Sequence, residues 1–128
     1  MNQESIIKIQ MMEQETNQLN EQLQFLEQNT QEMDELINSL EEIKKDGVKE
    51  VMVNLGKRIF LPVDIKDKKF FVDVGKGNFV KKSAEEIKKT VEQERDKLKY
   101  NKNIIIRKLN DLQEEMEKMI NEIQKEQK

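Results

Sequence analysis

The sequence predicts a mainly α-helical chain with a small β insert, in which two β-hairpins join an antiparallel two-helix coiled coil. Apolar residues at both ends of the chain recur in steps of three and four, the spacing of a coiled-coil seam. Between these ends the period changes to two, and Gly-containing turns separate the runs. We therefore expect a first helix over 1–46, two hairpins forming an oligomerisation body over 47–83, and a second helix over 84–128.

Composition supports a coiled coil over an ordinary compact domain. Charged residues make up 38% of the 128 residues and hydrophobic residues 35%, whereas typical domains hold about 25% and about 45–50%. Apolar material is therefore too scarce for one large core. Intrinsic disorder is the alternative that this composition allows, and the regular apolar spacing argues against it.

The first helix has a seam that runs unbroken for five heptads, as in a left-handed supercoil. The two rows of seam residues are Ile9, Thr16, Leu23, Thr30 and Ile37, and Met12, Leu19, Leu26, Met33 and Leu40. Thr16 and Thr30 weaken this seam, either to favour one register or as tolerated imperfections. Lys44 and Lys45 suit the negative end of the helix dipole and Gly47 suits a left-handed cap, so the helix should end here.

The middle of the chain predicts four short strands in two hairpins. The first pair of strands alternates around Val53 and Leu61, with a turn at Gly56-Lys57. The second pair alternates around Val72, with a turn over 75–78. Pro62 has no N–H to donate to a ladder, so it should lie at an edge or bulge.

A four-stranded sheet of this size has little core and open edges, so we expect strands from other chains to complete it. Four of the five Phe residues lie in this segment, and both faces of the strand at Phe70-Phe71 carry an aromatic side chain, as expected if both are covered. The residues expected to make oligomer contacts are Val51, Val53, Ile59, Phe60, Leu61, Val63, Phe70, Phe71, Val72, Val74, Phe79 and Val80.

The second helix is expected to begin at Ala84, because Ser83 and Glu86 form a capping box, and to end near Glu126. Its expected seam residues are Ala84, Ile87, Val91, Leu98, Ile105, Leu109, Leu112, Met116, Met119 and Ile123, with polar interruptions at Glu94 and Asn101. The four-residue steps from Asn101 to Leu109 predict a stutter that locally unwinds the coil.

Two helices of nearly equal length, each about 60 Å at 1.5 Å per residue, should fold back antiparallel when hairpins join them. Charge supports this arrangement, because residues 1–43 hold ten acids and one Lys, while residues 85–110 hold eight basic and five acidic residues. The expected acidic neighbours on the first helix are Glu32, Asp34, Glu35, Glu41 and Glu42. Such pairs select partner and orientation more than they add stability.

The second hairpin carries the motif Val72-Asp73-Val74-Gly75-Lys76-Gly77-Asn78-Phe79-Val80-Lys81-Lys82-Ser83, which leads directly into the second helix. With Val53-Asn54-Leu55-Gly56 and Phe60-Leu61-Pro62-Val63, it resembles the α class of prefoldin subunits, and the order helix, two hairpins, helix is similar to that family over essentially the whole chain. The resemblance implies a hexamer of two α-class and four β-class subunits, with β-barrels at its centre and six coiled-coil tentacles, or self-association into filaments. It also implies that the tentacle ends hold unfolded polypeptide without ATP and pass it to a group II chaperonin.

The paired helix ends carry more apolar residues than one seam needs, with Ile6, Ile7, Met11 and Ile120 off the seam. Four of the seven Met residues lie here, and the flexible Met side chain suits promiscuous surfaces. Packing of the helix ends on each other is the competing interpretation. The residues expected to bind client are Ile6, Ile7, Ile9, Met11, Met12, Met116, Met119, Ile120 and Ile123.

Other functional classes find little support. The chain has no Cys and no His, which excludes thiolate nucleophiles, zinc fingers and His-based acid–base sites, and Gly75-Lys76-Gly77 suits a hairpin turn. We expect no enzyme activity, no cofactor and no metal. No stretch approaches the ~18 apolar residues of a membrane span, so we expect a cytoplasmic protein with neither membrane nor nucleic-acid partners. A structural scaffold or filament subunit without client transfer is the alternative to a chaperone.

Overall fold

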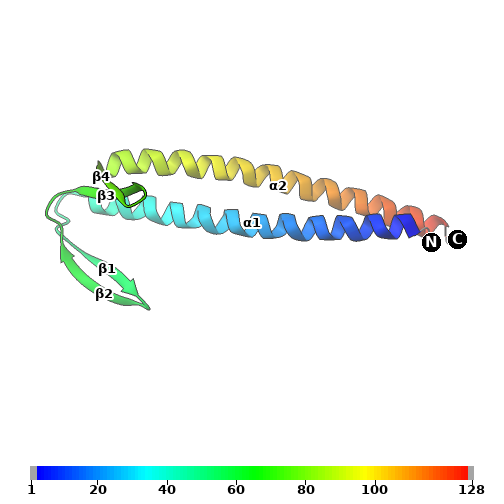
Figure 1. Ribbon diagram of the computed structural model, residues 1–128, viewed down its shortest axis with the longest axis horizontal. Coiled ribbons are helices and arrows are strands. Elements are labelled where there is room, and N and C mark those ends of the chain that lie inside the picture. Colours follow the sequence, from blue (N-terminus) through cyan, green and yellow to red (C-terminus); the bar gives the residue numbers. More distant parts are fainter. Residues whose placement is uncertain (1–2, 127–128) are drawn as a thin grey trace. The chain divides into compact units, whose positions relative to one another are not determined.

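The computed structural model describes residues 3–126. The elements follow in the order α1 (Gln3–Lys44), β1 (Glu50–Gly56), β2 (Ile59–Asp64), β3 (Lys69–Gly75), β4 (Asn78–Ser83) and α2 (Ala84–Glu126) (Figure 1). The fold class expected from the sequence is thereby confirmed. The chain divides into two compact units, which we call the coiled-coil unit (1–31 and 96–128) and the hairpin unit (Glu32–Arg95).

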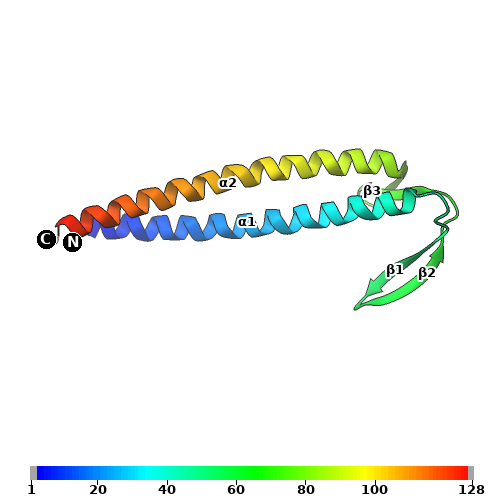
Figure 2. The ribbon, with the colours of Figure 1, turned by 180° about the vertical axis from the view of Figure 1, so that it is seen from behind.

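The coiled-coil unit is an antiparallel pair of helices. The first part of α1, blue in Figure 1, lies beside the last part of α2, orange to red, and Figure 2 shows the same pairing from behind. Leu19, Ile105 and Leu112 form its buried core. Half-buried seam residues pack against this core: Met12, Leu23, Leu26 and Leu109. Every expected seam residue of α1 is buried or half-buried, so the heptad reading of this helix is confirmed.

Two threonines lie on the α1 seam, and each bonds to its own helix. The Thr16 hydroxyl donates to the Met12 carbonyl oxygen at 2.8 Å, and the Thr30 hydroxyl donates to the Leu26 carbonyl oxygen at 2.7 Å. A buried hydroxyl that lacks a partner is costly, and a back-bond to the preceding turn supplies one locally. Thr30 can therefore be buried among apolar residues without a partner on α2.

The expected course of the α2 seam is wrong in one stretch. Glu94 and Asn101 are exposed, and Arg95 and Lys102 are half-buried in their place. The consecutive four-residue steps therefore fall at Ile87–Val91–Arg95 instead of ending at Leu109. Long basic side chains can occupy a seam because their hydrocarbon stems pack while their charged ends reach outward.

Those charged ends meet acids of α1. Arg95 Nη1 lies 3.1 Å from Asp34 Oδ1 in the hairpin unit, and Lys102 Nζ lies 3.4 Å from Glu27 Oε1 in the coiled-coil unit. The expected pairing of an acidic first helix with a basic stretch of the second is thereby confirmed for Asp34, and Glu27 forms a pair that was not among the expected ones.

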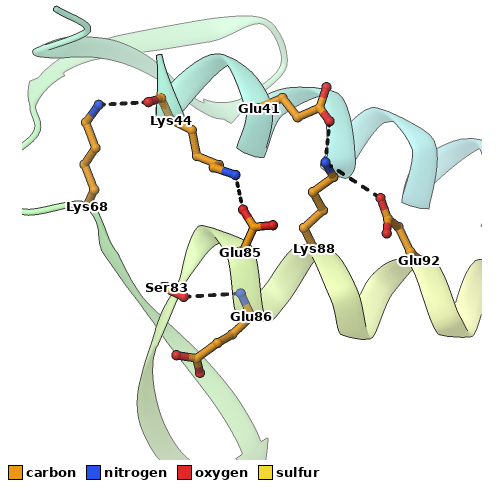
Figure 3. Close-up of polar contacts among 8 residues, drawn as sticks. All are labelled: Glu41, Lys44, Lys68, Ser83, Glu85, Glu86, Lys88 and Glu92. Atoms are coloured by element: carbon orange, nitrogen blue, oxygen red, sulfur yellow. Dashed lines mark hydrogen bonds and ion pairs between the residues drawn. The ribbon is translucent and has the colours of Figure 1, made fainter. Parts of the chain in front are cut away.

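The helix ends in the hairpin unit are capped. Glu86 N donates to Ser83 Oγ at 3.2 Å, so Ser83 caps the start of α2 as one half of the expected capping box. At the end of α1, Lys68 Nζ donates to the carbonyl oxygen of Lys44 at 3.3 Å (Figure 3) and to that of Lys45 at 2.8 Å. Gly47 follows with a φ of 85°, a conformation that glycine adopts without strain. The linker between the hairpins therefore supplies a cation at the negative end of α1.

The four strands form two separate two-stranded sheets, β1 with β2 and β3 with β4, both antiparallel. Two hairpins were expected and are confirmed, but the expectation of one four-stranded sheet is wrong for the single chain. Within the described residues no strand joins the two sheets, and no closed barrel forms. Pro62 lies opposite Met52 in a two-stranded ladder, where every strand is an edge.

Both hairpin turns are built in the same way. Asn54 Oδ1 accepts from Gly56 N at 2.9 Å, and Asp73 Oδ1 accepts from Gly75 N at 2.9 Å. Each ladder shifts register at that glycine, whose φ is 121° in Gly56 and 129° in Gly75. Such values are readily reached only by glycine, which explains the Gly-Lys pair that starts both turns.

Candidate functional site

The first hairpin exposes apolar side chains on both faces. Val53 pairs with Leu61 on one face, whereas Met52 pairs with Pro62 on the other. Only Val51 and Val63, among the expected contact residues of this hairpin, are half-buried. Its exposed apolar side chains are Met52, Val53, Leu55, Ile59, Phe60 and Leu61. An isolated two-stranded hairpin is marginal in water, so this surface is suited to being covered by other strands.

The second hairpin has one face against helices and one face bare. Phe70 and Val72 are half-buried and line a groove of about 510 Å³ together with residues of α1 and α2, among them Leu40 and Ile87. On the opposite face Phe71 remains 69% exposed. In the single chain only the Phe70 face is covered, so the expectation that both faces are covered does not hold without partners. The other exposed apolar residues of this hairpin are Val74, Phe79 and Val80.

Lys81 lies beside the bare face of the second hairpin. Its ammonium nitrogen is 5.4 Å from the centre of the Phe71 ring and 4.0 Å from Asp67 Oδ2. A cation over an aromatic face interacts favourably with the ring quadrupole, at about 0.5–1 kcal/mol for exposed sites. This contact orients Phe71 without covering it.

Ion pairs join the end of α1 to the start of α2 where the hairpins are attached (Figure 3). Lys44 pairs with Glu85, and Lys88 Nζ lies 2.7 Å from Glu41 Oε1 and 3.9 Å from Glu92 Oε1. The hydrogen bond and charge of Lys88 lower the pKa of Glu41, and those of Lys44 lower the pKa of Glu85. The same Glu41 contact raises the pKa of Lys88. These pairs fix which parts of the two helices meet.

The residues that were expected to bind client at the helix ends differ in the solvent exposure of their side chains. Ile7, Met11 and Ile120 are exposed, as expected for positions off the seam. Ile6, also off the seam, is half-buried. The remaining members of the set are half-buried seam residues: Ile9, Met12, Met116, Met119 and Ile123. Ile120 and Met116 also line a groove of about 530 Å³ with Thr16, Asn20, Leu109, Gln113 and Glu117.

A family model for the prefoldin subunit matches residues 12–128. The chain belongs to the prefoldin family. Prefoldin subunits are chaperone subunits and not enzymes. Among curated proteins, none matches this prefoldin chain.

Thirteen chains of solved structures match the fold of this prefoldin chain. One of them is a chain of filamentous PFD from Methanocaldococcus jannaschii, with 20% sequence identity and a TM-score of 0.69. The match covers 94% of this chain and 99% of the archaeal one. At this identity the likeness establishes the fold.

Sequence reasoning missed one apolar surface of this prefoldin. Phe25 is 65% exposed and lines a groove of about 550 Å³. Two signals were available: Phe25 directly precedes a seam leucine, and Ile104-Ile105-Ile106 places three isoleucines where the seam accommodates one. Met52 and Leu55 on the first hairpin were also absent from the expected contact residues: Met52 lies on the row of Glu50 and Asn54, whereas Leu55 continues the apolar row of Val53.

Over residues 3–126, no helix is long and apolar enough to cross a membrane. Within the same residues, no three acidic side chains gather as they would around a metal ion.

Proposed function

We propose that this chain is an α-class prefoldin subunit and an ATP-independent holdase that binds non-native polypeptides through the ends of its helices. One observation supports this most: Ile7, Met11 and Ile120 are exposed beside a seam that is already complete without them. Apolar side chains that a folded chain leaves in water are suited to binding another chain. The two hairpins favour the α class.

Assembly through the hairpins accounts for the second exposed surface. Strands from other subunits would pair with the open edges and cover Phe60 and Phe71. We propose a hexamer with β-class subunits, two α-class to four β-class, which gathers several helix pairs in one particle. Many weak contacts then act together, because the first contact raises the effective concentration of the client at the others.

We further propose that the particle acts in the cytoplasm and transfers its clients to a group II chaperonin. Exposed Met11 suits a surface that accepts many sequences, because its unbranched thioether adapts to different partners. No catalytic step and no cofactor is needed for holding and release. Membrane and nucleic-acid partners are not part of this proposal.

A structural role is the second candidate, in which the chain is a scaffold or filament subunit without client transfer. It is favoured by the likeness to a chain described as filamentous PFD. In this case the hairpins would join copies of one chain, and the helix ends would hold no client.

Light scattering separates the two candidates. A denatured test protein is diluted into buffer without ATP, alone or with the purified chain, and with the chain plus β-class subunits. Holding predicts that scattering falls in at least one mixture. Scattering unchanged in every mixture, with oligomers present in size-exclusion profiles, would favour the structural candidate.

A further inference from the structure

An apolar groove in the coiled-coil unit lies outside both surfaces assigned above. Its volume is about 550 Å³, and its lining residues are Glu21, Gln22, Phe25, Leu26, Asn101, Ile104 and Ile105. Phe25 and Ile104 come from opposite helices, and neither occupies the seam. Phe25 is 65% exposed, so the groove presents aromatic surface that the helix pair leaves in water.

The rim of the groove is suited to an extended backbone. Gln22 of α1 and Asn101 of α2 are exposed amides, and an amide both donates and accepts hydrogen bonds. An unfolded polypeptide has unpaired peptide groups beside its apolar side chains. A helix of a second copy has already paired its own peptide groups, so these amides would offer it little. The chemistry favours an extended segment over another helix.

Charge further restricts the kind of polypeptide segment that the groove favours. Glu21 is the one charged side chain among the described lining residues. Residues 3–31 and 96–126 together hold twelve acidic and eight basic residues, a net charge of −4. Complementary potential favours segments with Lys or Arg beside an apolar residue.

We propose that this groove binds an extended segment of non-native polypeptide in which an aromatic or large aliphatic side chain is flanked by Lys or Arg. The inference rests on the proposed holding function and adds a second contact to the helix-end surface. Phe25 comes two heptads after Met11, so both share one face of α1. Fourteen residues of helix rise about 21 Å, which about six extended residues span. One client segment can therefore contact both residues.

The test uses the full-length chain in the oligomeric form in which it purifies. The probe is a fluorescein-labelled nine-residue peptide with a central Phe, Lys on each side of it, and Ser and Gly elsewhere; a second peptide carries Glu in place of Lys. Fluorescence anisotropy gives each dissociation constant. Phe25→Gln should weaken binding of the Lys peptide about tenfold, since it removes most of the apolar contact. Glu21→Gln should weaken binding of the Lys peptide about threefold at low salt and strengthen binding of the Glu peptide, because it removes an attraction in the first case and a repulsion in the second.

Tyr100→Gln is the matched control, because Tyr100 is an equally exposed aromatic of the same unit that does not line the groove. It should bind both peptides as the unaltered chain does. Equal affinity of Phe25→Gln and the unaltered chain, while the latter still prevents aggregation, would overturn the groove and leave the holding function standing. A changed sedimentation coefficient in Phe25→Gln with unchanged peptide affinity would mean that the groove joins copies of the chain, which also overturns the inference. If the unaltered chain neither binds peptide nor prevents aggregation, the proposed function fails and the groove inference fails with it.

Discussion

Thr30 shows how one polar side chain is tolerated in a thin apolar seam. Thr30 is buried, and its hydroxyl donates a hydrogen bond to the Leu26 carbonyl oxygen of the preceding turn. The hydroxyl therefore does not require a hydrogen-bond partner on α2. That carbonyl is already an acceptor for the helical N–H four residues on, so the second bond adds little.

Thr30→Val should therefore stabilise the chain, because a methyl group replaces a hydroxyl in the seam. The free energy of unfolding is expected to rise by roughly 1 kcal/mol. Thr16→Val is the matched control and should give a smaller rise, since Thr16 is only half-buried. Urea titrations followed by circular dichroism measure both values. A loss of stability in Thr30→Val, or duplicate amide signals in its NMR spectrum, would instead show that the hydroxyl selects one register.

Phe71→Asp should separate folding of the chain from its assembly. Phe71 is 69% exposed in the single chain, so the carboxylate costs little there, whereas an assembled barrel would bury it without a partner. Size-exclusion chromatography should show loss of the oligomer with unchanged helical circular dichroism. Tyr100→Asp, on α2, should leave the oligomer intact. Survival of the oligomer in Phe71→Asp would contradict assembly through this face.

Predictability from sequence differs among elements for a physical reason. The α1 seam could be read directly, because its spacing is unbroken and only two threonines depart from apolar character. The α2 seam could not be predicted in this way, because Arg95 and Lys102 have the character of surface residues in the sequence. Only the structure shows that these side chains are half-buried and that their charged groups pair with acidic residues of α1. The hairpins were predictable from Gly-Lys turns. The separation of the strands into two sheets was not predictable. Residues 65–68, which join the hairpins, carry no sequence signal for whether a strand of one hairpin pairs with a strand of the other.

The ion pairs between α1 and α2 predict a dependence of helix pairing on pH. The pKa values of Glu41 and Glu85 lie below the ordinary 4.5, so each carboxylate stabilises the folded chain above that value and loses its contribution as pH falls through the lowered pKa. The pKa of Lys88 lies above 10.5, so its contribution persists below 10.5 and is lost as pH rises further.

Glu41→Gln should accordingly lower the melting temperature between about pH 5 and pH 10 and have no effect well below pH 4. Thermal melts across this range measure the difference. Glu35→Gln, another exposed carboxylate of α1, is the control and should shift melting less at pH 7. A difference between Glu41→Gln and the unaltered chain that grows as pH falls would contradict the pairing with Lys88.

At the scale of the whole molecule, the two compact units allow holding and assembly to be tested apart. Residues 1–11 and 117–128 belong to the coiled-coil unit, and their removal leaves every residue of the hairpin unit in place. The truncated chain should keep the oligomeric state of the parent and lose most of its ability to suppress scattering by a denatured test protein, with a residual effect from the groove at Phe25 that the truncation leaves in place. Collapse to a monomer in size-exclusion chromatography would contradict this separation.

Among the described residues, no large side chain is completely enclosed, and the sheets have only two strands each. Contacts with partner subunits would then add to the stability that the single chain has of its own, which makes the melting temperature subject to mass action. Dilution should lower the melting temperature, and an excess of partner subunits should raise it. Supply of partners would in this way set how long a newly made copy survives proteolysis.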